Sequence, residues 1–296
     1  MHAEATLDLA SLLGRPIRTI DMRPVEEAVK GKRVLITGAG GTIGSELART
    51  VAQMEPAQLV MMDKAESALF SACDTVRDIF APVASLGDIC DAPPKCRPEI
   101  ILHCAAHKHV GMSEDFPALC IRNNCLGTAA ALEFAKECDA RFLLISTDKA
   151  VDPVSVMGTT KAVAERMTLA QGHPAVRFGN VLGSAGSVLT IWERQIRAGR
   201  SITVVAGATR LCMTIWEAAQ LVLRTLAWPD RPCVYALDMG EPVSIETLAR
   251  RLCDQFGAEH RFEYVEARGG EKRHESLYGS REHPEPTDCP HIFRIV

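Results

Sequence analysis

The chain has 296 residues, of which 47% are hydrophobic and 24% are charged, a composition that excludes an intrinsically disordered protein. The formal net charge of −4, without any run of like charges, argues against a surface for nucleic acid or anionic membranes and favours small-molecule chemistry. No apolar run reaches the roughly 18 residues that a membrane helix needs, and the N-terminus lacks a signal-peptide pattern, so we expect no membrane span and a cytoplasmic location.

Residues 1–30 precede the first predicted strand and are interpreted as an N-terminal arm that packs on the body of the protein or on a partner subunit. The eleven cysteines stand singly along the chain, without a CxxC pair. This spacing indicates free thiols in a reducing compartment and predicts no metal site.

Five short apolar runs, separated by helical patterns, follow the arm: RVLIT at 33, QLVMM at 58, EIILHC at 99, RFLLIS at 141 and PAVRF at 174. Such alternation predicts parallel strands with helical crossovers, and continuous apolar runs are typical of strands buried on both faces. In the first crossover, the apolar residues Ile43, Leu47, Val51 and Met54 recur at helical spacing. Residues 31–182 are therefore expected to form a Rossmann domain.

The rhythm of strands fades after residue 182. A helical stretch (SVLTIWERQIRAG), a short strand (SITVV) and a second helix (WEAAQLVLRTLA) follow, and VYAL at 234 has the composition of a strand that could return to the main sheet. We expect residues 183–296 to form a smaller substrate-binding region. The predicted fold class is α/β, a doubly wound parallel Rossmann sheet with a smaller C-terminal region.

A glycine-rich segment, TGAGGTIG, follows the first strand and opens the first helix. Its glycines, Gly38, Gly40, Gly41 and Gly44, suit a tight turn where backbone N–H groups approach a pyrophosphate. Asp63 follows the second strand, 19 residues after Gly44, where a carboxylate would accept hydrogen bonds from the adenosine ribose and favour NAD. Lys64 could instead pair with a 2′-phosphate, which leaves NADP open. The alternative is a glycine-rich turn that only allows close helix packing.

Polar segments follow two of the central strands. AAHKHVGMSED comes after IILHC, and STDKAVDPVSVMGTTK comes after RFLLIS. Because ligands of open parallel sheets gather beyond the carboxyl ends of the strands, these two segments are expected to line the reaction site.

At these motifs the sequence resembles the extended short-chain dehydrogenase/reductases, and within them the polysaccharide-biosynthesis branch of UDP-N-acetylglucosamine 4,6-dehydratases. The resemblance runs from about residue 31 to the C-terminus and is carried by TGAGGTIGSEL, GDICD, HCAAHKHV, NNCLGT, STDKAV, VMGTTK, VRFGNVLGS, MTIWEA, LDMGEPVSI and GGEKRHESL. It implies a homo-oligomer that binds a UDP-sugar, moves a hydride from C4 of the sugar to NAD⁺, eliminates water across C5 and C6, and returns the hydride to C6.

The resemblance also implies catalytic roles. Thr147, Asp148 and Lys149 match the active-site triplet of the family, and we expect Asp148 to be the acid and Lys149 the base, its pKa lowered by a buried cleft. Met157 and Lys161 occupy the positions of the usual Tyr-x-x-x-Lys pair. Lys161 can reach the nicotinamide ribose, whereas methionine cannot ionise and is interpreted as a packing residue beside the substrate.

Further contacts follow from the same resemblance. The cofactor is expected to meet Gly38, Gly40, Gly41, Thr42, Ile43, Gly44, Asp63, Lys64, Asp88, Ile89, Ala105, Ala106, Lys108, Asn124 and Lys161. The substrate is expected to meet His109, Glu114, Asn180, Arg210 and Arg268. Four segments depart from the branch, namely HVGMSE at 109, SAGS at 184, RLCMT at 210 and RGGEK at 268, with Ala185 in place of an arginine and Leu211 in place of an aromatic residue.

These departures leave the particular hexosamine open and keep two alternatives in view. One is an NAD(P)H-dependent 4-ketoreductase or epimerase of a UDP-4-keto-6-deoxy-hexosamine, which would keep the scaffold with an altered pocket. The other is a non-catalytic dinucleotide-binding protein, suggested by Met157 in the place of tyrosine.

Overall fold

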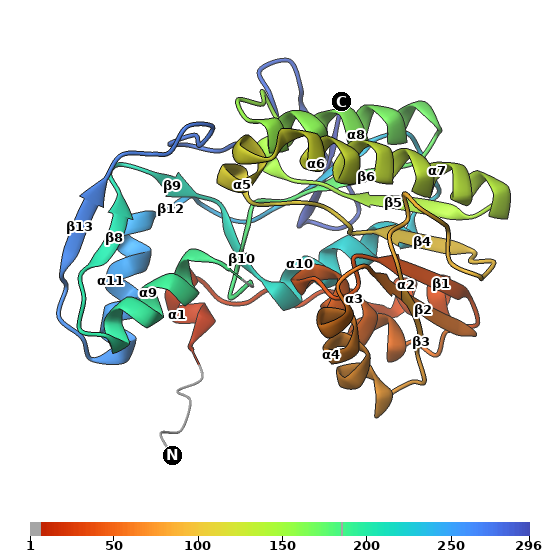
Figure 1. Ribbon diagram of the computed structural model, residues 1–296, viewed down its shortest axis with the longest axis horizontal. Coiled ribbons are helices and arrows are strands. Elements are labelled where there is room, and N and C mark those ends of the chain that lie inside the picture. The colour runs from red at the N-terminus through yellow and green to blue at the C-terminus, as the bar shows by residue number, and fades with distance from the viewer. Residues whose placement is uncertain (1–6, 185) are drawn as a thin grey trace.

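A nine-stranded sheet forms the centre of the larger of two lobes in the computed structural model, which describes residues 7–184 and 186–296 (Figure 1). The strands lie in the order β14-β15-β11-β6-β5-β4-β1-β2-β3. Neighbouring strands are parallel throughout the part of this order that runs from β11 to β3, and β14 and β15 add an antiparallel edge. Their bounds are β1 Arg33–Thr37, β2 Gln58–Asp63, β3 Val83–Leu86, β4 Ile100–His103, β5 Arg141–Ile145, β6 Ala175–Arg177, β11 Val234–Leu237, β14 Pro284–Pro286 and β15 Ile292–Ile295.

The doubly wound α/β fold expected from the sequence is confirmed, and all five apolar runs are strands of this sheet. The segment VYAL is β11, which pairs in parallel with β6. Since β14 and β15 also join the sheet, the chain returns to the larger lobe after residue 182. The regions 31–182 and 183–296 are therefore two parts of the sequence, and their boundary does not coincide with the boundary between the lobes.

Helices cover both faces of the sheet (Figure 1). On one face lie α2 Arg23–Val29, α3 Thr42–Ala52, α4 Glu66–Arg77 and α10 Ile215–Arg224. On the other lie α5 Val110–Asp115, α6 Pro117–Ile121, α7 Gly127–Cys138 and α8 Val156–Ala170, with the π-helical turn η1 Arg122–Leu126 between α6 and α7. The short 3₁₀ turns η2 Asp148–Ala150 and η3 Thr225–Ala227 follow β5 and α10.

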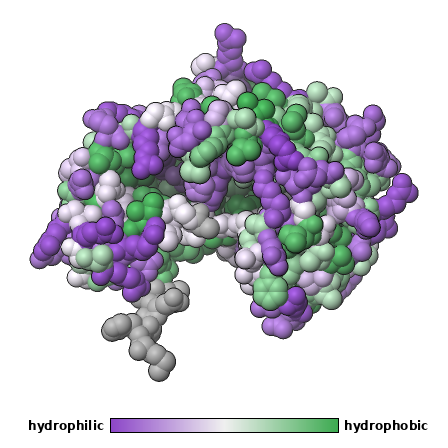
Figure 2. Space-filling model, viewed as in Figure 1, coloured by the Kyte–Doolittle hydropathy of each residue, from purple (hydrophilic) through white to green (hydrophobic). Residues whose placement is uncertain are grey.

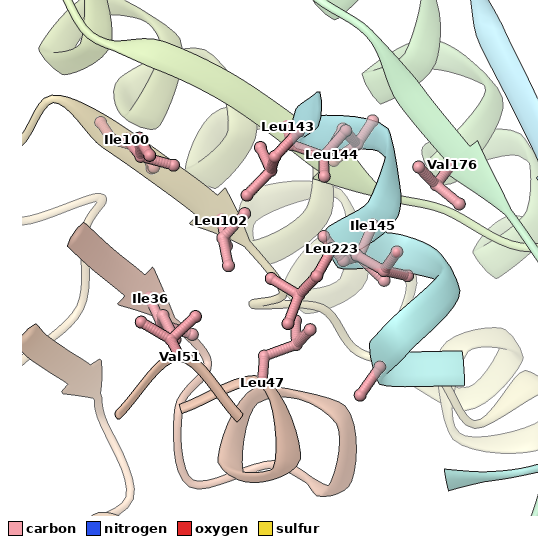
Figure 3. Packing of buried hydrophobic residues seen from close by; sticks show 14 of the residues in the cluster. Ile36, Leu47, Val51, Ile100, Leu102, Leu143, Leu144, Ile145, Val176 and Leu223 are labelled. Carbon is pink, nitrogen blue, oxygen red and sulfur yellow. The ribbon is translucent and has the colours of Figure 1, made fainter. Parts of the chain in front are cut away.

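The core of the larger lobe is built where α3 packs on the sheet (Figure 3). Leu47 and Val51 of α3 point toward Ile36 of β1 and Leu102 of β4, and all four side chains are fully buried. The helical spacing noted in the sequence thus gives α3 its apolar face. Burying each such side chain stabilises the fold by roughly 1.5–3 kcal/mol.

The smaller lobe has a separate apolar cluster around the fully buried Trp192. Its main elements are α1 Leu9–Leu13, α9 Val188–Arg197, α11 Ile245–Phe256 and the parallel pair of β8 Ile202–Val205 with β13 Phe262–Val265. Two short pairs lie between the lobes, β7 Asn180–Leu182 with β10 Cys212–Thr214, and β9 Thr209–Arg210 with β12 Val243–Ser244. Figure 2 shows the molecular surface hollowed between the two lobes.

The N-terminal arm packs on the body of its own chain. Its first helix, α1, joins the cluster of the smaller lobe through Leu12 and Leu13, and its second helix, α2, joins the core of the larger lobe through Val25 and Val29. Within the described part of the chain no helix is long and apolar enough to cross a membrane. The eleven cysteines are free thiols, as their spacing indicated.

Candidate active site

The turn between β1 and α3 forms a compact glycine cradle. Gly38 has a φ of +66°, and a Cβ added there would lie 2.6 Å from the backbone nitrogen of Ala105. A Cβ at Gly44 would lie 2.2 Å from the carbonyl oxygen of Gly38. Only glycine allows this approach, which leaves the N-terminus of α3 open to an anionic ligand.

A pocket of about 140 Å³ lies against this cradle. Of the residues expected to meet the cofactor, its lining includes Gly38, Gly41, Asp63, Lys64, Asp88, Ile89, Ala105 and Ala106. The lining among the described residues does not include Gly40, Thr42, Ile43, Gly44, Lys108, Asn124 or Lys161. The sequence reasoning missed six lining residues. Five of them lie at or just after the carboxyl ends of strands, and the sixth lies in η1: Thr37, Met62, Gly87, Cys104 and His107, and Asn123.

Backbone hydrogen bonds fix Asp63 at the rim of this pocket. Its Oδ2 accepts from the N–H of Gly40 and its Oδ1 from the N–H of Ala65, each at 2.9 Å. The neighbouring Lys64 donates from Nζ to Asn123 Oδ1 at 2.7 Å and lies 3.7 Å from Asp88 Oδ2. The carboxylate of Asp63 therefore has a fixed orientation, while the ammonium of Lys64 is paired with Asn123 and Asp88.

The segment that follows β5 brings the expected triplet together. Thr147 Oγ1 donates to Asp148 Oδ1 at 2.8 Å, and Lys149 Nζ donates to the same oxygen at 3.0 Å. Lys149 Nζ also donates to Asn180 Oδ1 at 3.1 Å. The side chain of Asp148 is fully buried, whereas Lys149 lines the larger cavity described below.

A second carboxylate, Glu275, completes this cluster and was missed by the sequence reasoning. It lies in the segment between β13 and β14, and its Oε1 is 3.0 Å from Lys149 Nζ and 3.6 Å from Arg210 Nε. Its side chain is 3% exposed, and it shares the ammonium of Lys149 with Asp148. The residue stands in the GGEKRHESL motif, but no spacing in the sequence relates it to Lys149, 126 positions earlier.

Charges within the cluster set its protonation states. Burial acts to lower the pKa of Lys149, but the negative charges of Asp148 and Glu275 outweigh it, and the pKa is raised above its usual value. Burial acts to raise the pKa of Asp148, but the charge and hydrogen bond of Lys149 hold it below its usual value. Burial raises the pKa of Glu275 to about 7. The expectation that the cleft lowers the pKa of Lys149 is therefore wrong in direction, since two carboxylates stabilise the ammonium.

Met157 and Lys161, four residues apart, lie on one face of α8. Met157 is buried, in keeping with a packing role. Lys161 is 5% exposed, and its Nζ donates to the carbonyl oxygen of Ile145 at 2.6 Å. Burial lowers its pKa to about 8, even though the charge of Glu165 acts in the opposite direction.

The larger cavity, of about 310 Å³, lies between the lobes. Its lining includes the expected substrate residues His109, Asn180 and Arg210, and residues not singled out in the sequence: Val110, Val154, Ser155, Gly186, Val188, Trp192, Thr203, Val205, Ile245, Gly270, Glu271, Lys272 and Glu275. Among the described residues the lining includes neither Glu114 nor Arg268. Glu114 instead accepts the N–H of Val156 at 2.8 Å and so holds the first turn of α8. Ala185 lies outside the described residues.

A family model described as a polysaccharide biosynthesis protein matches residues 34–296. The chain belongs to this family. The family lies within the extended short-chain dehydrogenase/reductases, a group of nucleotide-sugar enzymes, so the resemblance found in the sequence is confirmed.

Three relatives illustrate the family. The capsular polysaccharide biosynthesis protein CapD of Staphylococcus aureus is 37% identical over 94% of this chain and 50% of its own length. The probable polysaccharide biosynthesis protein EpsC of Bacillus subtilis is 38% identical over 92% of this chain and 49% of its own. A UDP-glucose 4-epimerase of Rickettsia canadensis is 32% identical over 67% of this chain and 61% of its own. The chain spans about half the length of CapD and EpsC.

Solved structures share the fold. Pen from Bacillus thuringiensis superposes with a TM-score of 0.82 at 26% identity, over 90% of this chain and 88% of that one. DesIV, a dTDP-glucose 4,6-dehydratase from Streptomyces venezuelae determined with NAD and TYD bound, has a TM-score of 0.74 at 19% identity, over 84% of this chain and 89% of that one.

Proposed function

We propose that this family member is a UDP-N-acetylhexosamine 4,6-dehydratase that uses NAD. The observation that carries the proposal is the buried cluster of Asp148, Lys149 and Glu275, which lies at the carboxyl end of β5 and borders the larger cavity. A dehydration needs groups that give and take protons at neighbouring carbons, and this cluster holds two carboxyls and an ammonium. CapD and EpsC are named as polysaccharide biosynthesis proteins, and DesIV, which shares the fold, is named as a dTDP-glucose 4,6-dehydratase.

The glycine cradle fits a dinucleotide, because Gly38 and Gly44 let the turn pack so closely that the start of α3 lies beside the smaller pocket, where backbone N–H groups can meet a pyrophosphate. When bound, NAD supplies a hydride acceptor. Asp63, held in place by two backbone N–H groups, is positioned to accept hydrogen bonds from ribose hydroxyls and to repel a 2′-phosphate. Lys64 is already engaged by Asn123 and Asp88, which favours NAD over NADP.

The chain's own residues then have distinct tasks. Lys149 enters as an ammonium and can donate a proton to a sugar oxygen in the cavity, while Asp148 enters as a carboxylate and can accept one. These roles reverse those expected from the sequence. Lys161 adds a buried amino group on α8, and Arg210 adds a cation that suits the diphosphate of a UDP-sugar.

Turnover of UDP-N-acetylglucosamine tests the proposal. The protein should form a 4-keto-6-deoxy sugar nucleotide without added NADH, and Lys149→Ala should lower kcat by on the order of 100-fold or more. Lys136→Ala, on the exposed side of α7, is the matched control and should leave kcat unchanged. Absence of ketosugar from the wild-type protein, or equal rates for the two variants, would refute the assignment.

A second candidate is a 4-ketoreductase or epimerase, favoured by the relative named UDP-glucose 4-epimerase. A ketoreductase consumes reduced cofactor in proportion to product, so the absorbance of NADH would fall when a UDP-4-keto-6-deoxy sugar is added. An epimerase would return a 4-epimer that keeps its C6 hydroxyl. A protein that binds the dinucleotide tightly and turns over none of these sugars would instead be a non-catalytic binding protein.

A further inference from the structure

Lys149 joins two acids, Asp148 and Glu275, that are far apart in the sequence. Both side chains are almost completely buried, and each presents an oxygen to the same ammonium. Asp148 Oδ2 and Glu275 Oε2 have no N–H or O–H donor among the residues that the structure describes. A proton shared between the two carboxyls would give both of these buried oxygens a partner, so the pair has a place for one proton.

The charged groups around these two acids come from several elements. Lys149 of η2 lies 3.0 Å from an oxygen of each acid, and Arg210 of β9 lies 3.6 Å from Glu275. Cys212 of β10 also faces the cluster, but burial raises the pKa of its thiol to about 12, so it stays protonated. Two cations thus balance two carboxylates, and the pair can hold either no proton or one without a large excess of charge.

We infer that Asp148 and Glu275 act as one acid–base unit, in which Glu275 stores the single proton that passes through the active site during dehydration. The inference rests on the proposed function and adds to it a residue from the C-terminal segment. Glu275 is placed to do this because it shares Lys149 with Asp148 and lines the larger cavity.

The proton balance of the reaction requires such a store. The C4 hydroxyl gives its proton to the pair as the C4–H hydride leaves for the bound dinucleotide, which oxidises C4 to a ketone. The pair then takes a proton from C5 and gives one to the C6 oxygen, so that the C6–O bond breaks, water leaves and a C5–C6 double bond forms. The hydride returns to C6, the stored proton goes to C5, and the pair is left as it began.

The rate of this cycle should depend on pH. The pair must start with both carboxyls ionised, and the pKa of Glu275 is about 7, so kcat/KM should rise as the pH rises through about 7. Glu275→Gln keeps the size of the side chain but cannot titrate. We expect it to lower kcat by on the order of 100-fold with little change in KM, and to abolish this inflection.

Two further variants separate proton storage from a structural role. Glu275→Asp keeps a carboxyl and should recover part of kcat together with the pH inflection. Glu266→Gln makes the same chemical change at an exposed position on the same segment and should behave as the wild type. Thermal unfolding of each variant checks that it is folded. A Glu275→Gln protein with wild-type kcat and an unchanged pH profile would overturn the inference.

Infrared spectroscopy tests the pair without substrate. The C=O band of a protonated carboxyl in the wild-type protein should appear as the pH falls through about 7, and it should be absent in Glu275→Gln and altered in Asp148→Asn. An unchanged titration in both variants would overturn proton sharing, whatever the enzyme does. A normal titration in a wild-type protein that forms no ketosugar would refute the dehydratase assignment and leave the shared proton established.

Discussion

Lys161 carries an amino group in a site that disfavours its charge. It is 5% exposed, its Nζ donates to the carbonyl oxygen of Ile145, and burial lowers its pKa to about 8 from the usual 10.5 of a lysine. In the unfolded chain the group binds a proton more tightly. Stability should therefore rise with pH between about 8 and 10.5, and the cost of the buried charge is fully present below that window.

Replacing this lysine should stabilise the protein and impair its function. The lowered pKa corresponds to a cost of roughly 3 kcal/mol, and the lost hydrogen bond offsets roughly 1 kcal/mol of it, so we expect Lys161→Met to raise the free energy of unfolding at pH 7 by about 2 kcal/mol. Cofactor affinity should fall. Urea unfolding checks the first point, with Lys136→Met on exposed α7 as the control. A variant less stable than the wild type at pH 7 would contradict this account.

Single residues also show where sequence reasoning reaches and where it stops. Asp148 and Lys149 could be singled out because they directly follow an apolar strand whose carboxyl end faces a ligand site. Glu275 could not, since only the folded chain brings it to that strand. The same contact reverses the expected pKa of Lys149, because the sequence shows one neighbouring carboxylate and the structure shows two.

At the scale of elements, the turn from β1 to α3 was predicted from its glycines and is packed too closely for a side chain at Gly44. The added Cβ of Gly44→Ala would meet the carbonyl oxygen of Gly38 at 2.2 Å, so the turn must open. We expect a loss of about 1–3 kcal/mol in stability and a large loss of cofactor affinity. Calorimetric titration with NAD measures the second effect.

Gly127→Ala provides the control for this change. Gly127 begins α7 with helical backbone angles, and a Cβ there would lie at an ordinary 3.5 Å from Cys90 Sγ. The substitution should therefore leave NAD affinity unchanged and should not destabilise the protein. Equal affinities for the two alanine variants would show that the cradle tolerates a side chain.

Elements that the sequence did not reveal share a physical cause. β3 is a short strand at the sheet edge, and three of its four residues are exposed, so it lacks the apolar run of a buried strand. β14 contains two prolines and lies at the opposite edge. Central strands can be recognised in the sequence, because burial on both faces makes them continuous apolar runs. Edge strands lack this pattern, and they form because of neighbouring strands that only the fold provides.

At the scale of the whole molecule, the N-terminal arm ties the two lobes together. Between α1 in the smaller lobe and α2 in the larger one, Arg15 donates to Glu217 at 2.6 Å and the N–H of Arg18 donates to the same oxygen at 2.8 Å. Glu217 is fully buried at the start of α10, where its other oxygen accepts the N–H of Thr214 at 2.9 Å. The arm therefore couples the larger lobe to the smaller lobe, which borders the larger cavity.

Removing this tie should loosen the smaller lobe first. Arg15→Ala leaves Glu217 buried with backbone donors but without its cation, which should cost about 2 kcal/mol at pH 7. The Arg15 hydrogen bond and charge help to hold the pKa of Glu217 below its usual value against the opposing effect of burial. The difference in stability between Arg15→Ala and the wild type should therefore shrink as acid protonates Glu217.

Hydrogen exchange should show α11 and β8 opening before β1 and β4 in the Arg15→Ala variant. The control is Arg23→Ala, which removes an exposed pair with Asp21 and should change neither stability nor exchange. Uniform loss of protection across both lobes would mean that the arm adds stability without coupling the lobes.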